Sequence, residues 1–210
     1  AALEMGKRMN LKNVEIVHKQ VLQKAEGTLV EIKGVCDFTP IKRDELVLPK
    51  RRKSLSDQQM KDYVKQHPIK VVAATVGEDE HSVGVREVID IKHGGVEKFG
   101  IEAIFLGTSC PIEKLVDAAI ESKAQAILCS TIISHNDVHT KNMKKLSDLC
   151  IEKGVRDKII LVSGGTQVTD EIAKANGMDV GFGRGSNGTS VASFIIKRLM
   201  GLPNNEEEEE

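Results

Sequence analysis

From residue 69 onward the chain alternates five short apolar runs with five amphipathic stretches, and this alternation constrains its fold more than any other feature. The runs are rich in β-branched residues and have the length of buried strands, whereas the stretches have the apolar spacing of helices that cover a sheet. The pattern favours an α/β fold: a five-stranded parallel, doubly wound sheet of the flavodoxin-like or Rossmann type, with strand order 2-1-3-4-5. We expect strands over 69–76, 102–106, 126–130, 158–163 and 179–183, and helices over 83–93, 111–122, 136–152, 168–175 and 188–200.

Residues 1–50 have a different pattern, in which segments 14–22 and 27–38 alternate apolar and polar residues as half-exposed strands do. A piece of this size buries little surface alone. We therefore expect a small α+β segment that packs against another surface, with a second copy of itself as the favoured partner.

A linker and a short amphipathic helix are expected over residues 51–68, with the helix over 54–66 and Ser54 or Ser56 as its cap. The basic run 50–53 is interpreted as solvated linker rather than as a nucleic-acid site. The large domain then covers residues 69–202. Residues 203–210 end in five glutamates and are expected to form a disordered acidic tail.

The composition argues against several classes of partner. Thirty basic and 31 acidic residues give a net charge of −1, and 3% of residues are aromatic, so no nucleic-acid surface is indicated. No run of apolar residues is long enough to span a membrane. The four cysteines show no CxxC spacing and the chain does not start like a signal peptide, so we expect a cytoplasmic protein with buried thiols.

A polar loop follows the first expected strand of the sheet, at the edge where doubly wound folds bind ligands. It contains Asp79 and, two residues later, His81. A histidine there can bind a metal through one ring nitrogen while the aspartate accepts a hydrogen bond from the other nitrogen and fixes the tautomer. From its position alone, His81 could also be a solvated loop histidine that binds no metal.

Hydroxyl groups and glycines follow the other strands at the same edge. Ser130 and Ile132 follow the third strand, Gly164 and Gly165 follow the fourth, and Gly183 follows the fifth. Glycines at these places let a bulky ligand approach the backbone closely, although each glycine pair could equally form a tight turn.

Together these pieces resemble the cobalamin-binding domain of adenosylcobalamin-dependent mutases and methionine synthase, whose three-part pattern is DxHxxG, SxL and GG. The match runs from residue 69 to residue 200, with Ile132 in place of the usual leucine. The resemblance implies that His81 replaces dimethylbenzimidazole as the lower ligand of cobalt, and that the displaced nucleotide tail enters a slot beside Ser130. It assigns cobalamin binding to Asp79, His81, Ser82, Gly84, Ser130, Ile132, Gly164, Gly165 and Gly183.

Lys92 lies 11 residues after His81, and this spacing resembles that of aminomutases that use both adenosylcobalamin and pyridoxal phosphate. In that family the lysine forms the internal aldimine with pyridoxal phosphate, so the resemblance makes Lys92 catalytic and cofactor-binding. A lysine nucleophile must be partly unprotonated, and His93 and Arg86 could supply the nearby positive charge that this requires. A solvated surface lysine is the alternative.

Within this family the chain is most similar to the small subunit of lysine 5,6-aminomutase, with ornithine 4,5-aminomutase as the alternative. A separate short chain favours the lysine enzyme, because in the ornithine enzyme this domain resembles the end of a longer chain. The resemblance implies a radical isomerisation that moves the terminal amino group of D-lysine or L-β-lysine to the neighbouring carbon. It also implies a larger TIM-barrel catalytic subunit, an α2β2 heterotetramer and an N-terminal dimerisation segment.

Two other classes of protein fit parts of the sequence. A non-catalytic corrinoid carrier of methyl groups would bind cobalamin but give Lys92 no role, and a flavodoxin-like signalling domain would bind no cobalamin. His135 and His139 have the spacing of a zinc pair on one helix face, but no third ligand is apparent, so we expect them to line the cobalamin rim or face solvent.

Overall fold

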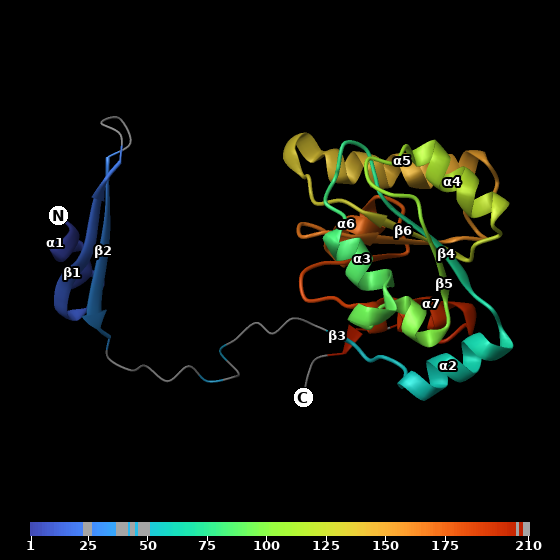
Figure 1. Cartoon of the computed structure of the whole chain (residues 1–210), viewed down its shortest axis with the longest axis horizontal. Coiled ribbons are helices and arrows are strands. Elements are labelled where there is room, and N and C mark those ends of the chain that lie inside the picture. The colour runs from blue at the N-terminus through green and yellow to red at the C-terminus, as the bar shows by residue number, and fades with distance from the viewer. Residues whose placement is uncertain (23–26, 37–41, 43–44, 46–50, 205, 208–210) are drawn as a thin grey trace. The chain divides into compact units, whose positions relative to one another are not determined.

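The structure is a computed structural model that describes residues 1–22, 27–36, 42, 45, 51–204 and 206–207 (Figure 1). The chain divides into two compact units, Ala1–Pro49 and Lys50–Glu210. Three parts of the sequence predictions lie outside the described residues: the end of the strand expected over 27–38, the first residue of the basic run 50–53, and residues 205 and 208–210 of the acidic tail.

The described part of the first unit contains α1 (Ala2–Arg8) and an antiparallel pair of strands, β1 (Lys12–Val21) and β2 (Thr28–Val35). The alternation in the sequence predicts both strands. It does not predict α1, which is short and contains a glycine, a poor helix former.

Gly6 explains how α1 packs on this strand pair. A Cβ atom at Gly6 would lie 2.6 Å from Val14 Cγ1 and 3.1 Å from Ile32 Cδ1, so the helix backbone lies directly on these two side chains. Because side chains alternate along a strand, Leu29 and Val35 lie on the opposite face from Ile32, where each is 54% exposed.

The second unit begins with a linker segment that packs against the sheet domain. β3 (Arg51–Arg52) pairs with β9 (Glu206–Glu207), so a two-residue strand forms in a tail where the sequence indicated no regular structure. Arg52 Nη2 lies 2.8 Å from Asp170 Oδ2, and both side chains are largely buried. The Arg52 guanidinium also lies 5.6 Å and 5.8 Å from the ring centroids of Phe182 and Phe194.

The expected amphipathic helix is α2 (Asp57–Gln66). Ser56 and Gln59 form a capping box: the Gln59 N–H donates to Ser56 Oγ at 3.3 Å, and the Ser56 N–H donates to Gln59 Oε1 at 2.9 Å. Ser56 is therefore the cap, and Ser54 lies before the helix.

A parallel sheet of five strands in the order β5-β4-β6-β7-β8 forms the centre of the second unit. This is the predicted order 2-1-3-4-5, and the chain changes direction across the sheet between β4 and β6. The strands are β4 (Lys70–Thr75), β5 (Glu102–Phe105), β6 (Ala126–Ser130), β7 (Ile160–Gly164) and β8 (Val180–Phe182).

Helices cover both faces of the sheet (Figure 1). On one face α2, α3 (Val83–Ile89) and α7 (Gly188–Leu199) enclose one hydrophobic core, and on the other α4 (Ile112–Glu121), α5 (Val138–Glu152) and α6 (Asp170–Ala175) enclose a second. The period of two along each strand supplies both cores, since alternate residues of a strand face opposite sides. These features confirm the predicted fold class.

Asp90 interrupts the helix that the sequence predicts over 83–93. Its backbone is extended, and its carboxylate accepts a hydrogen bond from the Lys92 N–H at 2.8 Å. α3 therefore ends at Ile89, and two 3₁₀ helices follow, η2 (Ile91–His93) and η3 (Val96–Phe99).

Cys110, Cys129 and Cys150 are buried as expected, and Cys36 is exposed. Burial raises the pKa of Cys129 to about 12 and that of Cys150 to about 11, so both remain thiols at neutral pH. In the part of the chain that the structure describes, every helix is too short or too polar to cross a bilayer.

Candidate functional site

Asp79 lies in the loop between β4 and α3 and is 1% exposed. Its Oδ1 accepts a hydrogen bond from the His81 N–H at 2.9 Å and pairs with His81 Nδ1 at 2.8 Å. Its Oδ2 accepts from the backbone N–H groups of Ile132 and Ile133, the latter at 3.0 Å. One carboxylate therefore joins the loops that follow β4 and β6, the two strands at the switch point of the sheet.

The hydrogen bonds of Asp79 determine its charge. Burial alone would raise its pKa, but the backbone N–H donors and the His81 ring outweigh burial and lower the pKa below its usual value of 3.8. In the neutral tautomer that carries its hydrogen on Nδ1, the ring donates that N–H to the ionised carboxylate and has a lone pair on Nε2. The His81 side chain is 60% exposed, so this nitrogen is available to a metal ion.

A cavity of about 500 Å³ lies between α3 and α7, at the carboxyl ends of β6, β7 and β8. Its lining includes apolar residues of the sheet and of α7, such as Leu128, Phe182 and Val191. The cavity is also lined by six residues that the sequence assigned to cofactor binding: Gly84, Ser130, Ile132, Gly164, Gly165 and Gly183. Asp79, His81 and Ser82, the residue that precedes α3, are not part of the lining.

The glycines of this lining fall into two groups. A Cβ atom at Gly165 would lie 1.9 Å from Thr131 O, and one at Gly183 would lie 2.6 Å from a backbone oxygen, so packing alone excludes a side chain there. Gly84 has nothing within 4 Å of its Cβ position, and Gly164 has only Phe182 O at 3.8 Å. The packing of the fold therefore does not require glycine at these two positions.

Lys92 lies in η2, where its backbone is held and its side chain is exposed. The structure does not bring this side chain into the cavity, although the neighbouring residue His93 lines it. Of the two groups expected to assist Lys92, His93 Nδ1 lies 3.7 Å from an Asp90 oxygen, and Arg86 lies over the Phe105 ring at 4.7 Å from its centroid.

Sequence reasoning missed the walls of the cavity. Glu87 and Val88 of α3 line it from one side and Val191 of α7 lines it from the other, as does Arg184 in the loop before α7. An inward-facing valine in an amphipathic helix predicts a core position, and periodicity cannot distinguish contact with a ligand from contact with another helix.

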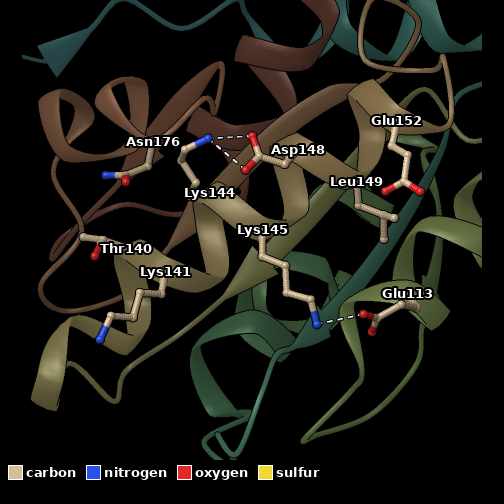
Figure 2. Close-up of a pocket in the computed structure, with 9 residues that line it drawn as sticks. All are labelled: Glu113, Thr140, Lys141, Lys144, Lys145, Asp148, Leu149, Glu152 and Asn176. Carbon is tan, nitrogen blue, oxygen red and sulfur yellow. Dashed lines mark hydrogen bonds and ion pairs between the residues drawn. The ribbon is translucent and has the colours of Figure 1, made fainter.

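A second groove, of about 590 Å³, runs along α5 on the other face of the sheet (Figure 2). Its lysines are occupied: Lys144 pairs with Asp148 at 2.6 Å, Lys145 pairs with Glu113 at 2.7 Å, and Lys141 donates to a backbone carbonyl at 2.7 Å. Exposed pairs of this kind are typical of a solvated surface, so this groove is not the candidate site.

The structure does not support a zinc site at the histidine pair. His135 lies in a 3₁₀ turn, η4 (His135–Asp137), whose last two residues have φ of 53° and 58° and separate it from α5. His139 is buried in the first turn of α5, so the two rings do not share a helix face. No group of three or more histidine, cysteine or acidic side chains within the described residues could hold a metal ion.

Comparison with known proteins identifies the family. Residues 69–192, more than half of the chain, match the B12 binding domain. The chain belongs to the B12-binding family. Residues 1–50 match a second family, the dimerisation domain of d-ornithine 4,5-aminomutase.

Two relatives place this B12-binding chain among aminomutase subunits. It is 58% identical over 198 residues to the D-ornithine 4,5-aminomutase subunit beta of Acetoanaerobium sticklandii, which covers 94% of this chain but 27% of the relative. It is 32% identical over 212 residues to the lysine 5,6-aminomutase beta subunit of Fusobacterium nucleatum, which covers 95% of this chain and 79% of the relative. The chain thus spans about a quarter of one relative and four fifths of the other.

A solved structure agrees on the fold. The crystal structure of a cobalamin-binding protein from Desulfitobacterium hafniense DCB-2 has a TM-score of 0.52 to this B12-binding chain at 21% identity, and the match covers 70% of this chain and 68% of that chain.

The preference for the lysine enzyme over the ornithine enzyme needs correction. Identity to the ornithine relative is 58%, against 32% for the lysine relative. The argument from a short, separate chain fails, because these 210 residues also match a 27% share of a much longer relative. Length therefore does not discriminate between the two enzymes.

Proposed function

We propose that this chain is the cobalamin-carrying part of an aminomutase of the D-ornithine 4,5-aminomutase type. It binds adenosylcobalamin through His81 and pyridoxal phosphate through Lys92, and the enzyme moves the terminal amino group of its substrate to the neighbouring carbon. The higher identity to the ornithine relative supports ornithine as the substrate, and D-lysine or L-β-lysine is the second candidate.

The observation that carries this proposal is the pairing of the exposed His81 ring with the buried Asp79 carboxylate at 2.8 Å. Imidazole nitrogen is a good ligand for a transition metal, and a carboxylate on the other ring nitrogen raises its basicity. The donor set therefore fits cobalt with His81 as its lower ligand. The adjoining cavity fits the displaced nucleotide tail, because Gly84 and Gly164 leave space that the fold itself does not need.

When bound, adenosylcobalamin supplies radical chemistry and pyridoxal phosphate supplies a carbonyl group that can hold an amine. The residues of this chain contribute binding and orientation. His81 Nε2 binds the metal, Asp79 keeps the proton on Nδ1, and the apolar walls of the cavity exclude water from the tail.

Lys92 is exposed, so its side chain is accessible to a coenzyme and to a partner. No described part of the chain forms a barrel or a complete pyridoxal phosphate site around it. We infer that the remaining contacts to the coenzyme and the substrate come from a larger TIM-barrel subunit or domain. Residues 1–50 would join two copies of this chain, giving an α2β2 assembly in the cytoplasm.

The first experiment tests the cobalt ligand. The full chain is loaded with cob(II)alamin, and its electron paramagnetic resonance spectrum is recorded with unlabelled and with ¹⁵N-histidine protein. Histidine ligation is supported if the nitrogen hyperfine splitting changes with the ¹⁵N label. The splitting should also be lost in His81→Ala and kept in His135→Ala. If the nitrogen splitting is the same with and without the histidine label, the nucleotide base stays on the metal and the proposal fails.

The second experiment tests Lys92. The assembled complex is treated with pyridoxal phosphate and borohydride, and the labelled peptides are mapped. A phosphopyridoxyl group on Lys92 supports the proposed aminomutase function. The labelled peptide should be absent in Lys92→Arg and present in Lys61→Arg. Prior addition of D-ornithine should protect Lys92 more than D-lysine does. Cobalamin binding with Lys92 unlabelled would instead indicate a corrinoid carrier.

A further inference from the structure

The backbone of Lys92 is held in a tight turn. Asp90 Oδ1 accepts from the Lys92 N–H at 2.8 Å, and Asp90 O accepts from the His93 and Gly95 N–H groups at 3.1 Å and 2.9 Å. Gly94 closes the turn in the left-handed region, with φ of 73°. These bonds fix where the Lys92 side chain leaves the surface without contacting its amine.

This turn lies directly against the start of α7. A Cβ atom at Gly188, the first residue of α7, would lie 2.4 Å from Gly95 Cα, 2.9 Å from Gly94 O and 2.8 Å from Val88 O. A Cβ atom at Gly95 would lie 2.4 Å from the backbone of Ile89. Backbone meets backbone here, so neither side can move inward and no side chain separates them.

The same segments form the walls of the cavity between α3 and α7. Val88 and His93 line one wall, and Gly188 and Val191 line the other. His93 is the chain neighbour of Lys92, and it is exposed, so a molecule in the cavity can contact it directly. The turn that carries Lys92 is therefore continuous with the wall of the cavity.

We propose that Gly95 and Gly188 are positioning residues that couple the cavity to Lys92. When the nucleotide tail of cobalamin fills the cavity, this coupling orders the turn that carries Lys92. This inference rests on the proposed function, since it takes the tail as the occupant and Lys92 as the residue that holds pyridoxal phosphate. An occupied cavity limits the opening of α3 away from α7, and the Lys92 turn then fluctuates less. By linkage, ordering of the turn must in return strengthen cobalamin binding.

Hydrogen exchange of the full chain tests this coupling. Exchange of the amides in residues 90–97 is measured without ligand, with cobalamin, and with cobinamide, which lacks the nucleotide tail. We expect cobalamin to slow exchange in this segment about fivefold or more and cobinamide to leave it unchanged. Equal protection by both ligands, or protection by neither although both bind, overturns the coupling. Failure of both to bind overturns the proposed function instead.

Variants separate coupling from folding. His93→Ala removes an exposed wall residue next to Lys92, so cobalamin should still bind while its protection of residues 90–97 falls toward the level with cobinamide. Gly188→Ala should weaken the coupling further if the variant folds. Glu121→Ala, an exposed residue of α4 on the opposite face of the sheet, is the control and should keep full protection. Full protection in His93→Ala would contradict the proposed contact.

Discussion

Asp79 orders two loops with one carboxylate, and its hydrogen bonds make that carboxylate sensitive to acid. Because its pKa is lowered in the folded state, it stabilises the fold fully above about 3.8, and this stabilisation is lost as pH falls below that value through the lower folded pKa. The Ile132 and Ile133 N–H groups would lose an ionised acceptor at the same time.

Asp79→Asn should therefore lower the free energy of unfolding at pH 7 by about 1–3 kcal/mol, since an amide group replaces an acceptor that faces several N–H donors. The difference in unfolding free energy from the unsubstituted protein should shrink as the pH falls below about 3.8, the ordinary pKa of this carboxyl group, because Asp79 then becomes protonated and loses its advantage as an acceptor. Urea unfolding followed by circular dichroism at several pH values measures it. Asp148→Asn, at an exposed ion pair, is the control and should change little. A difference that stays constant with pH would contradict the assigned charge.

The neighbouring glycines of the GG pair should respond differently to the same substitution. Gly164→Ala places a methyl group in free space, so the free energy of unfolding should change by less than about 1 kcal/mol while cobalamin affinity falls about tenfold or more. Gly165→Ala drives a methyl group into Thr131 O and should destabilise the fold by about 1–3 kcal/mol.

Urea unfolding and cobalamin titration of both variants measure these effects. Unchanged affinity in Gly164→Ala would show that the ligand does not approach this strand end. A stable Gly165→Ala variant would mean that the backbone can move there.

At the scale of the element, the Ser56 cap determines where α2 begins. Ser56→Ala should cost about 1 kcal/mol, because it leaves the Gln59 N–H without its acceptor. Ser54→Ala, which removes the other candidate cap, should change stability by less than about 0.5 kcal/mol. Tyr63, the single tyrosine of the chain, lies in α2, so its fluorescence reports unfolding of this element. Equal costs for both variants would contradict the assignment.

Elements could be predicted from sequence where local pattern and tertiary packing agree. The apolar runs that form β4, β6, β7 and β8 are almost entirely buried, so these strands followed from the pattern, and their order followed from the fold class that the alternation of strands and helices predicts. The predictions failed where a side chain competes with the backbone. Asp90 accepts the Lys92 N–H and ends α3 early, although the apolar spacing continues past it. The α+β class expected for residues 1–50 includes a helix, but α1 itself was not located, because its packing depends on Gly6 and glycine has a low helix propensity.

For the whole molecule, the pattern of the sequence located the edge where Asp79, His81 and the glycines gather, because the carboxyl ends of parallel strands must meet there. It could not show the cavity, whose walls come from helices that are distant in sequence. The choice between ornithine and lysine also lay beyond the pattern, since no substrate contact is visible in these residues.

The first unit should join two copies through the face that carries α1. On that face, Ile16 pairs with Ile32 and Val21 pairs with Thr28, and α1 leaves Ile16 47% and Val21 69% exposed. Ile16→Lys with Val21→Lys should shift the chain from dimer to monomer in sedimentation velocity, because charges would replace the buried apolar contact.

The control for this prediction places the substitutions on the opposite face of the two strands. Leu29→Lys with Val35→Lys adds the same charge and should leave the dimer intact. Dissociation in this control alone would place the interface on the other face of the strands. A chain that is monomeric without any substitution would remove the proposed role of residues 1–50.

The hydrogen bonds from Ile132 and Ile133 to Asp79 mean that the loop after β4 is held independently of the residue at position 81. Under the proposed function, the identity of the side chain that would bind the metal is thus separable from its placement. In His81→Gly, free imidazole could occupy the same place, and His81→Met or His81→Cys would present sulfur from an unchanged rim. If His81 holds the metal as proposed, the site would be a scaffold on which the side chain offered to the metal can be changed while the surrounding loop keeps its place.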